Sequence, residues 1–202
     1  DVLLIDDADH HLDDVARVAA DAASRGAAVV VTSRTSPPTA EPFRLPPLPT
    51  GVGGPSMRLF ADRAAAVRAD FDLGGGDDLA AVDQLLGGLP LAIELAAARL
   101  SVLTVGQIAT RLVDPRRVLG GPARREPARH HSLEAAVAWT AGNLGDPASR
   151  ALAGLAAGLL DPKSIDDAVL TDLAERSWIE PDEDSYRVLP VLRPFLASLA
   201  DP

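Results

Sequence analysis

The chain has 202 residues, of which 47% are hydrophobic and only 3% aromatic, and its formal charge at pH 7 is −10. This length and composition suit one large or two small domains with cores of Ala, Leu and Val, which favours packed helices over a β sandwich. The acidic charge argues against nucleic-acid binding, which relies on Lys and Arg, and the absence of cysteine excludes disulfides and thiolate chemistry.

The first 48 residues carry alternating strand and helix patterns. Their strand, helix and strand segments are VLLID (2–6), DDVARVAADAASRG (13–26) and AVVVTSR (28–34). A right-handed crossover would make the strands parallel and bring Asp6 to the same edge as Thr32, Ser33 and Arg34. The segment FRLPPLP (43–49) is expected to be a third, short strand that its prolines interrupt.

Helical spacing of apolar residues dominates residues 49–120, beyond the linker TGVGGP. Helices are expected in SMRLFADRAAAVRAD (56–70), DDLAAVDQLL (77–86), PLAIELAAARLSV (90–102) and TVGQIATRLV (104–113). Thr104 and Gln107 fit a capping box, and Pro90 fits the first turn of a helix, where its missing N–H costs nothing. The pattern predicts a separate helical domain.

The stretch DPRRVLGGPARREPARHH (114–131), rich in Pro, Gly and Arg, separates the helical domain from a C-terminal block, and the C-terminal domain is expected over 121–202. Helices are expected in LEAAVAWTAGNL, ASRALAGLAAGLL and IDDAVLTDLAERS, with starts at Ser132, at Asp146-Pro147, and at Ser164 with Asp167. The segment WIEPDEDSYRVLP predicts two short strands around an acidic turn, and residues 191–199 predict a last helix. Three helices, a hairpin and a further helix indicate a winged-helix domain.

Asp6 ends an apolar strand and Asp7 follows it, which matches the Walker B pattern of nucleotide triphosphatases. A carboxylate at that place holds Mg²⁺ directly or through water, and the next acid can orient a water molecule. Arg34, at the end of the neighbouring strand, could contact a terminal phosphate. The same residues also suit a plain strand end that leads through Asp caps into a helix, so on their own they leave both interpretations open.

Six motifs occur in a fixed order along nearly the whole chain, and they are VLLIDD, VVVTSR, PPLP, RLFADRA, GLPLAIELAAARL and RHHSLEAAVAW. Together they resemble the STAND class of signalling ATPases, which includes the NB-ARC proteins, and most specifically the actinobacterial LuxR-like and antibiotic-pathway transcriptional regulators. The resemblance implies the C-terminal part of a P-loop NTPase sheet over 1–48, a helical domain over 49–120 and a winged-helix domain over 121–202.

The resemblance also implies site residues. Asp6 corresponds to the Mg²⁺-associated aspartate and Asp7 to the accompanying catalytic acid. Thr32, Ser33 and Arg34 form the sensor segment, with Arg34 reading the nucleotide. Gly88, Leu89 and Pro90 form the GxP motif, whose proline packs on adenine. The implied cofactors of the intact protein are ATP or ADP with Mg²⁺.

The chain departs from the family at two places. The P-loop motif GxxxxGK[ST] is absent: the only lysine is Lys163, and Ala157 and Pro162 stand where glycines are needed. Proline has no N–H to offer a phosphate, so this segment is not a phosphate cradle. The Met-His-Asp motif of many NB-ARC proteins is replaced by residues 188–190, Val-Leu-Pro.

These features predict the distal part of an ATP/ADP-dependent switch in a bacterial transcriptional regulator. The family is a slow regulatory ATPase, but without a P-loop this chain is expected neither to bind ATP tightly nor to hydrolyse it. Two alternatives stay open. One is a non-catalytic binding module, in which a winged helix on a scaffold contacts DNA or protein, and the other is a degenerate STAND protein that binds no nucleotide.

The expected partners are an upstream P-loop segment and effector and sensor domains of the same protein, because Met57 is the only methionine and Asp1 does not resemble a native start. Self-association through the bared edge of residues 28–33 is also expected. We expect no direct nucleic-acid contact by this segment. No apolar run approaches the ~20 residues of a membrane span and no leader opens the chain, which predicts a cytoplasmic protein without membrane contact.

Overall fold

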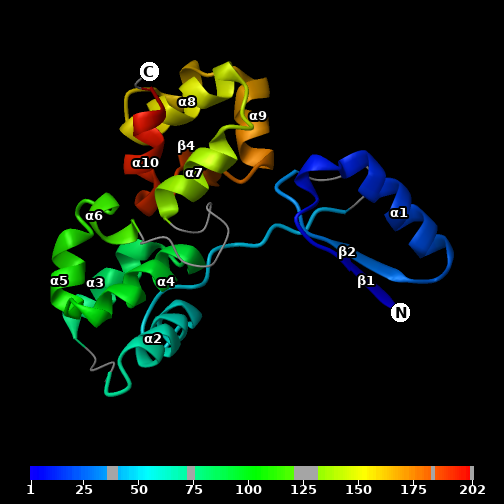
Figure 1. The fold of residues 1–202 in the computed structure, drawn as a ribbon. Coiled ribbons are helices and arrows are strands. Elements are labelled where there is room, and N and C mark those ends of the chain that lie inside the picture. The colour runs from blue at the N-terminus through cyan, green and yellow to red at the C-terminus, as the bar shows by residue number, and fades with distance from the viewer. Residues whose placement is uncertain (36–40, 72–75, 121–131, 183–184, 201–202) are drawn as a thin grey trace.

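A computed structural model describes residues 1–35, 41–71, 76–120, 132–182 and 185–200. Figure 1 shows three parts: a small unit of two strands and a helix, a group of helices in the middle of the chain, and a C-terminal block. Within the described residues, no helix combines the length and apolar character that crossing a membrane requires.

The N-terminal unit confirms the predicted strand, helix and strand. Its elements are β1 (Val2–Ile5), the 3₁₀ turn η1 (Ala8–His10), α1 (Leu12–Ser24) and β2 (Ala28–Val31). The strands pair in parallel, with Val2 opposite Ala28 and Ile5 opposite Val31. Gly26 takes a positive φ of 82° just after α1, a conformation that glycine adopts without steric cost.

Only one face of this two-stranded sheet is covered. Leu3 and Ile5 are partly buried, whereas Val2 is 74% exposed and Leu4 65% exposed, so the alternate side chains of β1 face opposite environments. Val30 of β2 is also exposed. The unit therefore buries little apolar surface for its size.

The predicted third strand at 43–49 is wrong. No strand is assigned to these residues, and Phe43 and Leu45 are largely exposed. The three prolines within the segment remove backbone donors that a sheet needs, which accounts for the extended but unpaired chain. Its end is nevertheless fixed, because the N–H of Leu48 donates to the carbonyl of Gly88 at 2.9 Å.

The helical group contains α2 (Pro55–Val67), α3 (Asp77–Leu86), α4 (Pro90–Ala98), α5 (Val105–Arg111) and the short α6 (Arg116–Leu119). Thr104 and Gln107 form the predicted capping box at the start of α5, and Pro90 occupies the first turn of α4. α4 is the centre of the group, because Ala92, Ile93 and Ala96 are fully buried. Small residues on α4 let α2 pack closely on it.

The C-terminal block contains α7 (Leu133–Ala141), α8 (Asp146–Ala157), α9 (Asp167–Glu175), the antiparallel hairpin of β3 (Glu180–Asp182) and β4 (Ser185–Arg187), and α10 (Arg193–Ala197). Ser132 caps α7 as predicted. The start of α9 differs from the prediction, because Asp166 rather than Ser164 is its N-cap and accepts from the N–H of Ala168. The element order matches the prediction, while the winged-helix assignment and the domain boundaries remain predictions.

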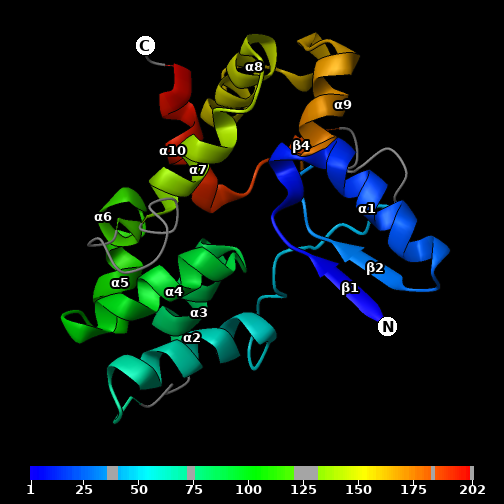
Figure 2. The same ribbon diagram turned by 45° about the vertical axis from the view of Figure 1, so that its right-hand side comes forward.

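Figures 1 and 2 agree on how these parts lie. In both views α1 and the two strands stand beside the C-terminal block, next to α9, and α2 to α6 gather below that block. The RHHSLEAAVAW motif lies partly outside the described residues, since 121–131 are not described.

Candidate functional site

The carboxyl ends of β1 and β2 bring the predicted Walker B and sensor residues together. The hydroxyl of Thr32 donates to the carboxylate of Asp6 and accepts from the N–H of Asp7 at 3.0 Å. Asp7 takes a left-handed backbone conformation with φ 57°, which turns the chain sharply as it leaves the strand. Asp6 itself is exposed, so oxygens of its carboxylate remain accessible to a ligand.

Asp9 completes this cluster, although the sequence analysis did not single it out. Its side chain is only 9% exposed. It accepts from the hydroxyl of Ser33 at 2.9 Å and from the backbone N–H of Arg34 at 2.6 Å. Asp9 is the third acid of the run DDAD that follows the first strand. A turn after the strand can bring an acid at this spacing back toward the strand ends, and this spacing is the sequence signal from which Asp9 could have been found.

The protonation of Asp9 follows from these contacts. Burial of the carboxyl by itself would raise the pKa of Asp9. The N–H of Arg34, the hydroxyl of Ser33 and the positive charge of Arg34 outweigh that effect, and the pKa of Asp9 lies below its ordinary value of 3.8. Asp9 is therefore a firmly ionised anchor for the end of β2.

Arg34 links the strand ends to the C-terminal block. Its guanidinium pairs with Asp9 at 3.1 Å and with Asp7 at 3.4 Å. It also lies over the indole of Trp139, a residue of α7, with 4.0 Å between Cζ and the ring centroid. A guanidinium this close to an aromatic face makes a cation–π contact.

A small cavity of about 100 Å³ opens beside this contact. Its walls come from the strand ends and the C-terminal block, and they consist of Asp9, Arg34, Thr35, Thr140, Asn143, Arg176 and Trp178. Arg176 is held by Asp172 of α9 at 2.7 Å. The cavity is polar, but its two arginines already have carboxylate partners.

The GxP segment lies elsewhere, on the corner between α3 and α4. Gly88 is buried with φ 70°, and a Cβ built there would stand 1.9 Å from the carbonyl oxygen of Leu48. Leu89 caps α4 and Pro90 opens it at an exposed position. Among the described residues, no hydrogen bond or ion pair joins this segment to Asp6, Thr32 or the rest of the strand-end cluster. The structure thus gives Gly88 a packing role, and the adenine role of Pro90 stays a prediction.

The segment around Lys163 has its own local structure. Pro162–Ser164 form one 3₁₀ turn, and the N–H of Lys163 donates to the side chain of Asp161 at 3.0 Å. That N–H is already engaged by a carboxylate, which agrees with the prediction that this segment is no phosphate cradle.

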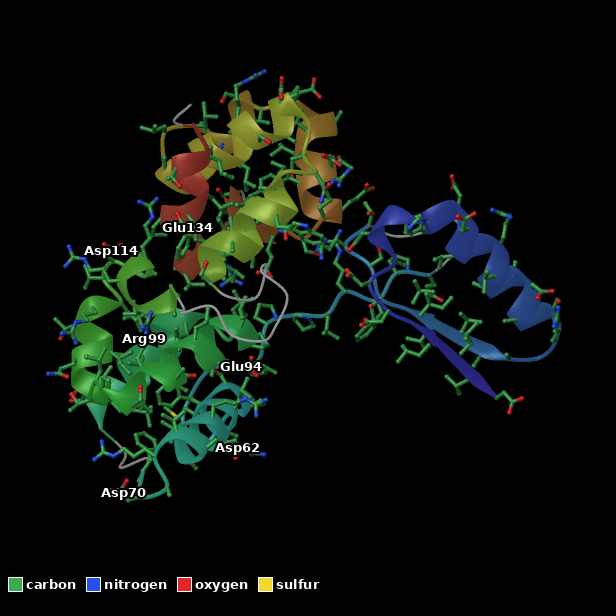
Figure 3. All side chains as sticks on the ribbon, in the orientation of Figure 1. Asp62, Asp70, Glu94, Arg99, Asp114 and Glu134 are labelled. Carbon is green, nitrogen blue, oxygen red and sulfur yellow. The ribbon has the colours of Figure 1, made fainter. Side chains whose placement is uncertain are left out.

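Charged residues elsewhere serve local packing. Figure 3 shows labelled acidic side chains on the helical group and on α7, away from the strand ends. Glu94 pairs with Arg63 at 2.9 Å, and Arg99 donates to the carbonyl of Val118 at 2.8 Å. Across the described ranges, no group of three or more His, Asp or Glu residues is placed to hold a metal ion.

Comparison with known proteins gives distant relatives in mycobacteria. Proteins of Mycobacterium tuberculosis and Mycobacterium bovis, each named "Putative HTH-type transcriptional regulator", are 33% identical to the chain in an alignment 170 residues long that covers 72% of the chain and 19% of the relative. An "Uncharacterized protein" of Mycobacterium tuberculosis is 37% identical over 108 residues, covering 52% of the chain and 27% of the relative. The chain spans about a fifth of the length of the first relatives, and no family model matches it.

Proposed function

We propose that the chain is the distal part of an ATP/ADP-dependent switch in a bacterial transcriptional regulator. The observation that carries the proposal is the cluster at the strand ends, where the accessible carboxylate of Asp6 accepts from the hydroxyl of Thr32 and the adjacent Asp7 pairs with Arg34, an arginine that also contacts a different part of the chain. Homology to a segment of proteins named as HTH-type transcriptional regulators supports the regulatory half of the proposal.

The residues present fit a nucleotide with Mg²⁺ only in part. Asp6 is exposed and shares one oxygen with Thr32, so it can hold a hydrated Mg²⁺ through direct or water-mediated contact. The metal, when bound, would neutralise phosphate charge. The phosphates themselves need backbone donors, which in the proposed switch would come from a P-loop segment upstream in a longer protein.

Each proposed residue then has a separate task. Asp6 holds the metal, Asp7 orients a water, and Arg34 distinguishes a terminal phosphate from its absence. Pro90 packs on adenine when the helical group closes on the strand ends. A switch requires two conformations, one with the helical group closed on the strand ends and one with it open, that differ in their affinity for ATP and ADP. A nucleotide shifts the equilibrium between them only by the difference between its affinities for the two conformations.

The test uses the longer regulator that contains this segment. Asp6→Asn should reduce Mg²⁺-dependent nucleotide retention by roughly tenfold or more, because the metal loses its charged ligand. Asp13→Asn is the matched control, since Asp13 is an exposed acid in the first turn of α1. Equal retention by the wild type and the Asp6→Asn protein would contradict the metal role of Asp6.

Arg34 needs its own measurement. Arg34→Ala should bring the affinities for ATP and ADP closer together, since the proposed reader of the terminal phosphate is gone. Equal affinities in the wild-type regulator would remove the basis for a sensor role.

A second candidate is a degenerate member that binds no nucleotide. It is favoured by the internal pairing of Arg34 with Asp7, Asp9 and Trp139, which satisfies the arginine without a ligand. Calorimetry of the longer regulator with Mg-ATP and Mg-ADP separates the two candidates. Binding of either nucleotide at micromolar concentration supports the switch, and the absence of heat at millimolar nucleotide supports the degenerate form.

A further inference from the structure

The contact between Arg34 and Trp139 joins two parts of the chain that are far apart in sequence. Arg34 follows β2, and Trp139 belongs to the last turn of α7. The guanidinium has the ring at 4.0 Å on one side and the carboxylate of Asp9 at 3.1 Å along its edge. Ring and carboxylate together define both the plane and the direction of the guanidinium.

Trp139 is well placed to act as a fixed surface. Its helix is anchored by the Ser132 cap and by Leu133 and Val137, which are buried in the core of the C-terminal block. Two neighbours on the cavity wall, Thr140 and Asn143, bond back to carbonyls of the same helical segment. The ring therefore belongs to a helix that is packed in the C-terminal block and not to the strand unit.

We infer that Trp139 is a positioning residue for Arg34: with the C-terminal block docked, the stack holds the guanidinium on Asp9 and withholds it from a phosphate. Undocking of the block releases the arginine. Docking and phosphate reading by Arg34 thereby exclude one another. The second half of this inference rests on the proposed nucleotide switch, whereas the stack itself does not.

The contact between Arg34 and Trp139 is expected to contribute measurably to docking without making it irreversible. The side chain of Arg34 is 33% exposed. The strength of its contact with Trp139 should therefore lie between that of a fully exposed and that of a fully desolvated cation–π pair. Loss of such a contact changes an equilibrium by about three- to tenfold. The docking equilibrium should shift by that factor when the ring is removed.

The test is made on this chain without nucleotide. In an NMR spectrum the ring current of Trp139 should displace the side-chain protons of Arg34 upfield of ordinary arginine positions. Trp139→Leu should abolish this displacement and speed exchange of the Arg34 Nε–H by about three- to tenfold. Trp139→Phe should retain part of both effects, because a smaller aromatic face remains.

Two further variants complete the design. Arg34→Lys keeps the positive charge but replaces the planar guanidinium with an ammonium group, which stacks poorly on an indole. The C-terminal block should therefore undock in this variant as it does in Trp139→Leu. Arg116→Ala is the control, because Arg116 lies 6.0 Å from the ring of Phe195 and takes no part in the strand ends. It should leave the Arg34 signals unchanged.

The outcomes separate the stack from the nucleotide proposal. Unshifted Arg34 protons in the wild type, or identical exchange in Trp139→Leu and Trp139→Phe, would overturn the positioning role. In the longer regulator, Trp139→Leu should raise the affinity for ATP relative to ADP, and an unchanged ratio would overturn the exclusion. Failure to bind any nucleotide would reject the proposed switch, and the exclusion with it, while leaving the stack intact.

Discussion

At the scale of single residues, two features of the backbone at position 88 require a glycine there. Its φ of 70° is costly for residues with a Cβ, and the Cβ would stand 1.9 Å from the carbonyl oxygen of Leu48. The carbonyl of Gly88 also accepts from Leu48. The family resemblance identified Gly88 as the start of a nucleotide motif, and the structure shows that the backbone packing here requires a glycine regardless of any ligand.

Gly88→Ala should therefore be severely destabilising. We expect the free energy of unfolding to fall by roughly 3 kcal/mol or more, because strain adds to a lost hydrogen bond and a steric clash. Gly158→Ala is the matched control, since Gly158 has the same φ of 70° but nothing within 4 Å of its Cβ position. It should lose only about 1 kcal/mol in chemical denaturation. Equal losses would show that the approach of Leu48 is not what matters.

Asp9 leads to a prediction about pH. Because the pKa of Asp9 is below 3.8, its ionised form stabilises the folded state above that pH, and this contribution is lost as the pH falls through the folded-state pKa. Asp9→Asn should weaken the protection of the Ser33 to Thr35 amides at pH 6, by roughly 1–3 kcal/mol. The difference from wild type should shrink below about pH 3.8.

Hydrogen exchange of the two proteins from pH 6 to pH 3 measures this difference. Asp62→Asn serves as the comparison, since Asp62 is an exposed acid on α2 (Figure 3). A gap between wild type and Asp9→Asn that stays constant with pH would contradict the assignment.

At the scale of elements, helix starts show how far local chemistry reaches. The predicted capping box at Thr104, the N-cap at Ser132 and the first-turn position of Pro90 are confirmed, because each depends on groups within one turn. Ser164 was predicted to begin α9, but its hydroxyl donates to the carbonyl of Asp161 at 2.6 Å. Ser164 and Asp166 are both good N-cap residues and lie two positions apart, so the sequence alone could not decide which of them caps α9.

The two candidates for this cap can be compared directly. Asp166→Ala should cost about 1 kcal/mol of stability, because Ala168 loses its acceptor at 2.8 Å. Ser164→Ala should cost clearly less, since its contact closes a single 3₁₀ turn. Thermal unfolding of both variants provides the measurement. A larger loss in Ser164→Ala would restore the original prediction.

At the scale of the whole molecule, stability is divided unevenly. The strands of the N-terminal unit leave Val2, Leu4 and Val30 exposed, whereas the α4 residues that face the centre of the helical group, Ala92, Ile93 and Ala96, are fully buried. Amide exchange should therefore be roughly tenfold or more faster in β1 and β2 than in α4. Uniform protection of a monomer would show that the two-stranded unit is more stable than its burial indicates.

The same division explains what the sequence could and could not predict. Periodic apolar residues located most helices and the parallel strand pair, because those patterns are local. The proximity of Asp6 to Thr32 also followed, from strand handedness alone. The stack of Arg34 on Trp139 did not, since it depends on how two separately folded parts meet and no local pattern encodes that meeting. The proline-rich segment was misjudged because its apolar residues resemble a strand while its missing donors forbid one.

The hydrogen bond between Leu48 and Gly88 bears on how firmly the N-terminal unit and the C-terminal block associate. Because Leu48 is held by Gly88, the chain between Arg34 and this fixed point on the helical group is a tether of about 14 residues, which can span at most roughly 50 Å. A tether of that length keeps the strand unit near Trp139 at an effective concentration on the order of millimolar. An interaction with an intrinsic Kd near 1 mM, or roughly 4 kcal/mol, is then about half formed. A few modest contacts would thus be sufficient for the inferred docking, and doubling the tether would shift its equilibrium by only about 0.6 kcal/mol.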